Sequence, residues 1–123
     1  MGCESLVQIF FHMMLNIKLY HWETKSYARH KASDKLHENL SESIDKFIEV
    51  YMGGYSRPEF TSSFSVKVRQ LDDFTIKEIL NEYIEFLKHD LPSYLKDSDT
   101  HLLNIRDDML AHINQTLYLF TLE

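Results

Sequence analysis

Residues 27–52 read YARHKASDKLHENLSESIDKFIEVYM, and this stretch decides the fold class. Apolar side chains recur in it every three or four positions, at Leu36, Leu40, Ile44, Phe47 and Tyr51. That period is typical of one buried face of an α-helix. The glycines that follow, Gly53 and Gly54, are typical of a helix end. We therefore predict a long amphipathic helix from Tyr27 to Met52.

Three more stretches carry the same period and predict helices at about residues 4–22, 75–91 and 98–120. The third helix begins with Thr75-Ile-Lys-Glu78, the pattern of a capping box. The expected buried faces are Leu6, Phe10, Met13 and Ile17, then Ile76, Leu80, Tyr83 and Leu87, then Leu102, Ile105, Met109, Ile113 and Leu117. The first helix has a second apolar strip, Phe11, Leu15 and Trp22, which we interpret as a subunit contact.

The composition limits the classes of protein to which this chain can belong. Its 123 residues predict one domain, and 44% apolar residues are enough for a packed core. Three Gly and two Pro are too few for the turns of an all-β fold, and the single Cys3 excludes a disulfide framework. A net charge of −6 argues against nucleic acid as a partner. Without a long apolar run or a secretion signal, we expect no membrane span and an intracellular protein.

The spacing of the predicted helices favours one topology. The first and last connections are short, whereas residues 55–73, which contain Pro58, form a long connection with room for one short helix. Two helical hairpins joined by one long crossover are the arrangement of ferritin-like bundles. The predicted fold is therefore all-α, a single ferritin-like four-helix domain over residues 1–123.

Four side chains on the helix at 27–52 carry the candidate chemistry: His30, Asp34, Asp45 and Glu49. At about 100° per residue they fall within one arc of about 100° beside the apolar stripe. Imidazole nitrogen beside carboxylate oxygen suits Fe(II), Zn(II) or Mn(II). His30 and Asp45 are about 22 Å apart along the helix, so they cannot share a metal within one chain. A second copy packed antiparallel about a two-fold axis would bring the two pairs together and create two equivalent sites.

At this point the chain resembles the Dps-type miniferritins. Their pattern is His-Trp near the end of the first helix, then His-x3-Asp, ten residues, and Asp-x3-Glu on the second. Here it reads His21-Trp22, His30-x3-Asp34 and Asp45-x3-Glu49. The resemblance implies that His21, His30 and Asp34 of one subunit and Asp45 and Glu49 of its mate bind iron, Fe2+ oxidised to Fe3+. It also implies a ferroxidase with no catalytic group beyond the metal ligands, in a dimer or a larger shell.

Three neighbouring side chains are expected to support this site from outside the ligand shell. Trp22 and Tyr27 are close enough in sequence to be oxidised in place of other molecules, and His37 lies between the core stripe and the acidic arc. On the last helix, Asp108 and His112 lie four positions apart, near His101. That spacing fits a minor metal site, but we favour a solvated polar face.

A second resemblance covers most of the chain. The run Leu19 to Asp34 and the segments Asn104 to Leu110 and Asn114 to Leu119 are similar to uncharacterised proteins from large DNA viruses of algae and protists. This resemblance implies a viral origin, hence the host cytoplasm or the virion, and no particular activity.

Two other interpretations of the same residues stay open. Acidic residues at four-residue spacing are common on the solvated face of a helix, so the chain is alternatively a non-catalytic structural or interaction protein that keeps the fold. In the other alternative the same ligands hold a zinc ion that stabilises a dimer without redox chemistry.

Overall fold

The computed structural model describes residues 3–60 and 63–122, and within them the chain is helical and has no strand. Its four α-helices are α1 (Cys3–Glu23), α2 (Tyr27–Gly54), α3 (Thr75–Glu85) and α4 (Thr100–Leu119). After α3 the chain continues through a π turn, η1 (Phe86–Asp90), and a 3-10 turn, η2 (Leu91–Tyr94). The predicted all-α class, with four main helices and one long connection between the second and third, is confirmed.

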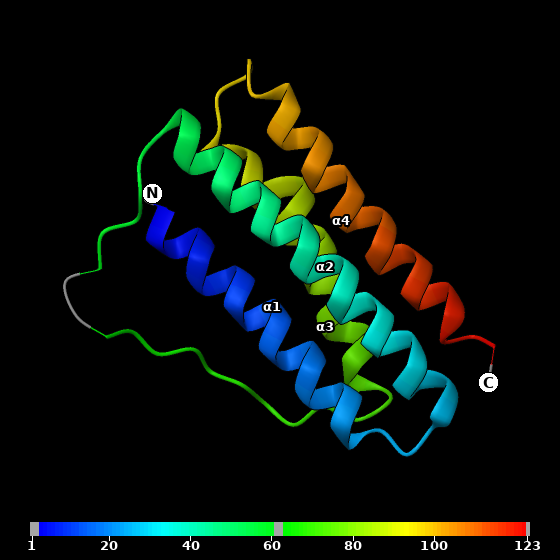
Figure 1. The fold of residues 1–123 in the computed structure, drawn as a ribbon. Coiled ribbons are helices and arrows are strands. Elements are labelled where there is room, and N and C mark those ends of the chain that lie inside the picture. Colours follow the sequence, from blue (N-terminus) through cyan, green and yellow to red (C-terminus); the bar gives the residue numbers. More distant parts are fainter. Residues whose placement is uncertain (1–2, 61–62, 123) are drawn as a thin grey trace.

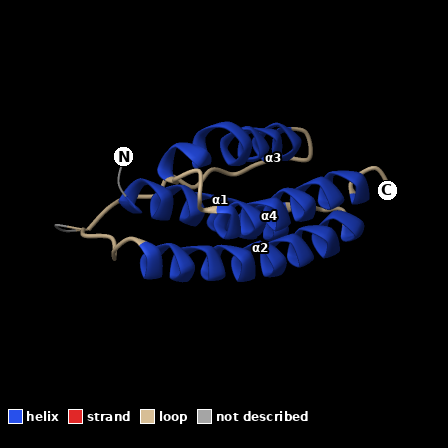
Figure 2. Ribbon diagram, turned by 90° about the horizontal axis from the view of Figure 1, so that it is seen from above, coloured by secondary structure: helices blue, strands red, loops and turns tan. Residues whose placement is uncertain are grey.

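Helix α2 packs between α1 and α4 (Figure 1). Helix α3 lies on the side of α1 and α4 that faces away from α2 (Figure 2). The connection after α2 returns along the flank of α1, so α3 starts beside the end of α1 and runs parallel to α2 (Figure 1). Hydrogen bonds fix this course, because the Glu59 amide donates to Glu4 Oε1 (3.1 Å) and the Arg69 amide donates to Asn16 Oδ1 (3.0 Å). The sequence left room for one short helix in this connection, but its described residues form none.

The core forms where the predicted apolar faces meet. The stripes of α1, α2 and α3 are buried as expected, and of the α4 stripe only Leu117 stays partly exposed. Phe10 of α1 meets Phe47 of α2 edge to face, with ring centroids 5.5 Å apart. Such aromatic pairs add about 0.5–1.5 kcal/mol beyond the burial of their area, so this contact helps to fix the register of α1 against α2.

The second apolar strip of α1 is covered only in part. Phe11 stacks on Phe64 of the connection, with centroids 6.0 Å apart, and Phe64 stacks on Phe60 at 4.5 Å. Leu15 and Trp22 remain 46% and 67% exposed. The connection therefore covers the start of the strip and leaves its second half open, where the subunit contact stays a prediction.

The start of α3 differs from the predicted capping box. The carboxylate of Asp72, not the side chain of Thr75, accepts the free amides, from Thr75 (2.8 Å) and Phe74 (3.0 Å). These bonds, together with that from the Thr75 hydroxyl, hold the pKa of Asp72 below its ordinary value. Asp72, three positions before Thr75, reaches the amides of the first turn. Thr75 is therefore the first residue of α3 and not its cap.

A buried polar seam joins α1, α3 and the connection. Asn16 is fully buried, and its amide nitrogen donates to the Tyr83 hydroxyl (3.2 Å) and lies 3.1 Å from Nε2 of the His12 ring. The Tyr83 hydroxyl donates to His12 Nδ1 (2.9 Å). Burial raises the pKa of Tyr83 to about 12, so its hydroxyl keeps its proton. With Nδ1 accepting from Tyr83, a neutral His12 carries its proton on Nε2.

Acidification is expected to destabilise the fold through this seam. Burial, and then the charge of Arg69, lower the pKa of His12 below 6.5, while Glu82 opposes that effect. The unfolded chain therefore binds the proton more readily, and stability is lost as the pH falls below about 6.5. We expect the melting temperature to fall by several degrees between pH 7.5 and pH 5. The variant H12Q, which keeps an acceptor and cannot titrate, is expected to show a shallower decline.

The melting temperature of H12Q is still expected to fall somewhat on acidification, because burial and the Lys18 charge also lower the pKa of His37. Melting curves of both proteins across this pH range test the expectation. An identical pH dependence of H12Q and the parent would contradict the role given to His12.

Candidate metal centre

His21 and His30 form a crossed pair at the turn between α1 and α2. His21 Nδ1 donates to the His30 carbonyl (2.7 Å), and His30 Nδ1 donates to the His21 carbonyl (2.8 Å). The two rings stack with centroids 3.9 Å apart and planes inclined by 17°. A carbonyl oxygen only accepts hydrogen bonds, so each ring carries its proton on Nδ1. Each neutral ring is then left with a lone pair on Nε2, the atom that would bind a metal.

Local sequence explains why the two histidines meet. Ser26 caps α2 by accepting the Arg29 amide (3.2 Å), which makes the turn after α1 short. Ser33, one turn further along α2, donates to the His30 carbonyl (3.2 Å). A short turn with His21 before it and His30 after it brings the two backbones close enough for reciprocal bonds.

Asp34 completes one half of the predicted site. Its Oδ1 lies 3.8 Å from His21 Nε2, so the three residues predicted to act from one subunit are neighbours. His21 is 7% exposed, whereas the Asp34 side chain is 53% exposed. The half-site thus opens to the surface along the face shared by α1 and α2.

Lys18 belongs to this half-site and was missed from the sequence. Its ammonium lies 3.8 Å from Asp34 Oδ1 and 5.8 Å from the centroid of the Trp22 ring. Lys18 precedes His21 by one helical turn, so the spacing that places side chains on one face could have identified it. Asp34 is therefore already partly neutralised by a cation from α1.

Asp45 and Glu49, the other predicted half-site, lie further along α2. Both side chains are exposed, and the pKa of Glu49 is raised, first by its hydrogen bond with Asp45 and then by repulsion from that charge. Asp45 lies about 16 Å along the helix from Asp34, at 1.5 Å per residue. In the part of the chain that the structure describes, no group of three or more His, Cys, Asp or Glu is placed to hold a metal. Neither predicted half-site is such a group within one chain, and the length of α2 separates the two.

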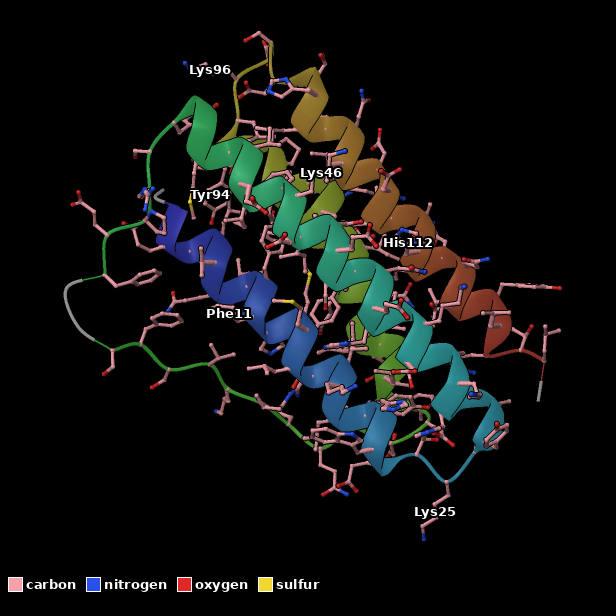
Figure 3. The ribbon with its side chains drawn as sticks, viewed as in Figure 1. Phe11, Lys25, Lys46, Tyr94, Lys96 and His112 are labelled. Carbon is pink, nitrogen blue, oxygen red and sulfur yellow. The ribbon has the colours of Figure 1, made fainter. Side chains whose placement is uncertain are left out.

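The supporting residues take different positions. Trp22 and Tyr27 are 67% and 73% exposed, and the Tyr27 ring lies 6.4 Å from that of His30. His37 is half-buried. On the other side of α2, Asp108 and His112 of α4 line a polar groove together with Lys46, whose side chain Figure 3 labels on α2. This groove fits the predicted solvated polar face.

An apolar groove lies beside Asp45, between α1 and α2. Its volume is about 470 Å³. Its lining is mostly apolar: Val7, Phe10, Phe11, Met14, Ile44, Ile48, Met52 and Pro58. None of the helices in the described residues combines the length and apolar character that crossing a bilayer requires.

Comparison with known proteins places the chain among uncharacterised viral-type proteins. It is 34% identical over its full 123 residues to an uncharacterised 14.6 kDa protein from the mobD–ri intergenic region of Enterobacteria phage T4, and it covers 86% of that protein. No solved structure matches the chain. The predicted likeness to an uncharacterised viral family is confirmed in this general form, with a phage relative. Residues 21–120 match the model of DUF5856, a family of unknown function, so this chain belongs to that family.

Proposed function

We propose that this protein binds and oxidises iron(II) at sites shared across a two-fold interface, in the manner of the Dps-type miniferritins that it resembles. One observation carries the proposal: the crossed pair of His21 and His30, which directs both Nδ1 protons to backbone carbonyls beside Asp34. Metal-binding histidines usually donate their second ring N–H to a carbonyl or carboxylate in this way. The donor set, two imidazoles and a carboxylate, suits iron(II).

An antiparallel pair of α2 helices would complete each site. A single register puts His30 opposite Glu49 and Asp34 opposite Asp45, because both pairs are centred between residues 39 and 40. The two-fold axis would pass through that point and generate two equivalent sites. The hydrogen bond with Asp45, and then the charge of that carboxylate, raise the pKa of Glu49, and a divalent cation between the two side chains would relieve the repulsion between their charges.

Two further features support this interface. Leu15 and Trp22 are exposed on α1 and the apolar groove lies between α1 and α2, so a second copy on this face would remove apolar surface from water. The long connection and the parallel course of α2 and α3 are also typical of a ferritin-like four-helix bundle. Iron is the substrate in this proposal, and zinc or manganese could compete for the same ligands. The protein would act inside the host cell or in the virion.

Native mass spectrometry of the full chain, with and without iron(II), tests the proposal. We expect an even-numbered assembly that carries about two irons per subunit, as in a di-iron carboxylate site. Loss of the metal in D45N, with the assembly intact, would place that residue in the site. A metal-free monomer, or a metal-free dimer indifferent to iron, would refute the proposal.

A second candidate function is favoured by Lys18. Its ammonium lies beside Asp34 and gives that carboxylate a partner without any metal. On this view the protein is a non-catalytic structural or interaction protein, and the histidines only close the turn. This second function predicts that native mass spectrometry will show a metal-free dimer that does not respond to iron(II). Firm retention of zinc without iron turnover would instead indicate a zinc-stabilised dimer.

A further inference from the structure

Lys18 lies between two groups that both attract a cation. Its ammonium is 3.8 Å from Asp34 Oδ1 and 5.8 Å from the centroid of the Trp22 ring. The Lys18 side chain is 33% exposed and that of Asp34 is 53% exposed, so the pair sits at the mouth of the half-site. A lysine there has room to move, because its long stem ends at the surface.

A divalent cation would compete with this lysine. Asp34 Oδ1 faces both Lys18 Nζ and His21 Nε2, each at 3.8 Å. A protonated lysine offers no lone pair, so it cannot join the ligands, and its charge repels a metal bound to the same carboxylate. The ammonium already lies over the Trp22 ring, 5.8 Å from its centroid, and the face of an indole ring attracts a cation at this distance, so the lysine keeps a partner when a metal takes Asp34.

We propose that Lys18 is a tethered counter-ion of the metal site. It holds Asp34 while no metal is present, and when a divalent cation binds it moves away from Asp34 and closer to the face of the Trp22 ring, over which it already lies. The proposal rests on the function proposed above and adds a residue that sets the metal affinity of the half-site. It also makes Trp22 a reporter of occupancy, since the cation that approaches its ring comes from the site itself.

Zinc is the suitable probe, because it accepts nitrogen and oxygen ligands and has no redox chemistry. Calorimetric titration of the full chain with zinc gives the affinity. The variant K18M removes the charge and keeps the stem, so zinc is expected to bind about tenfold more tightly, the effect of one like charge removed near the ion. K18R, which keeps the charge, is expected to bind zinc as the parent does. K46M is the matched control, since Lys46 lines the groove between α2 and α4 and its loss changes the net charge equally.

Fluorescence gives a second and independent measurement, because Trp22 is the chain's single tryptophan. In the parent protein, its emission is expected to change saturably with zinc, at the same concentrations as the calorimetric signal. In K18M, zinc should bind without that change.

The outcomes separate this proposal from the proposed function. If the parent and K18M both fail to bind zinc, the metal site itself is refuted. If the parent binds zinc and K18M binds it with the same affinity, the role of Lys18 is refuted and the metal site stands. Equal tightening in K18M and K46M would show a general charge effect and would also refute the role of Lys18. Emission that changes equally in the parent and K18M would refute the movement toward Trp22.

Discussion

The double variant D45N/E49Q is expected to lose iron(II) oxidation by about 100-fold or more while its helical content is unchanged. Both side chains are exposed on α2, so replacing them with amides of the same size removes two negative charges and disturbs no core contact. Amide groups cannot supply the further anionic oxygens that the half-site with His21, His30 and Asp34 needs from the second subunit. Oxidation followed by absorbance, with far-ultraviolet circular dichroism on the same samples, measures both properties. Unchanged oxidation would remove Asp45 and Glu49 from the site.

The matched control is E78Q/E82Q, which neutralises another exposed pair at four-residue spacing, on α3. It is expected to oxidise iron at the parent rate. A loss of activity in this control as well would indicate that net charge, and not a site on α2, governs the reaction.

Mixing two inactive variants tests whether each site is shared between chains. D34N damages one half-site and D45N/E49Q the other, so each protein alone is expected to be inactive. Refolding an equal mixture should restore about a quarter of the parent activity, because half of the dimers are mixed and each mixed dimer contains one intact site of two. No recovery from a mixture shown to contain mixed dimers would contradict a shared site.

The variant R29A is expected to lose about 2–4 kcal/mol of stability, or about 10 °C in melting temperature. Arg29 is 4% exposed, and its Nη1 donates to the Asp73 carbonyl (3.1 Å) and to the Tyr20 hydroxyl (3.4 Å). Its guanidinium lies 4.6 Å above the centroid of the Phe120 ring. One side chain thereby joins the end of α1, the start of α2, the end of the connection and the end of α4. Truncating it removes the hydrogen bonds to Asp73 and Tyr20 and opens a cavity beside Phe120.

Two variants calibrate that result in urea unfolding. R29K keeps the charge but loses the planar fork, so its stability is expected to fall between those of the parent and R29A. R57A removes an exposed arginine and is expected to stay within about 0.5 kcal/mol of the parent. A loss in R29A no larger than that in R57A would show that the cluster around Arg29 does not hold the four segments together.

The parts of the fold that follow from periodicity could be predicted from the sequence. The main stripes on α1, α2 and α3 are buried as expected, because an apolar stripe at helical spacing is buried when that side of the helix faces the core. The proximity of His21 to Asp34 was expected from the resemblance to the miniferritins, and the short turn between two long helices accounts for it. These features depend only on local spacing.

The remainder depended on contacts between distant segments. Nothing in local spacing indicates that the connection would extend along α1, with Phe64 stacked on Phe11. The same is true of Arg29, a charged residue that is buried because Asp73 and Phe120 surround it. In the candidate site, Lys18 was not predicted because a protonated lysine has no lone pair with which to bind a metal. In each of these cases, contacts with residues distant in sequence set the position of the segment or side chain, and the local sequence pattern did not.

The crossed histidines have a consequence for reading the relatives of this protein. Each ring both closes the turn between α1 and α2 and carries the nitrogen proposed to bind a metal. Selection for a well-formed turn would preserve the two histidines even in a lineage that had abandoned metals altogether. Asp45 and Glu49 have no such second duty, because they are exposed on α2 and bond to each other. Across the family, the presence or loss of Asp45 and Glu49 should therefore show which members bind a metal, whereas the presence of the two histidines should not.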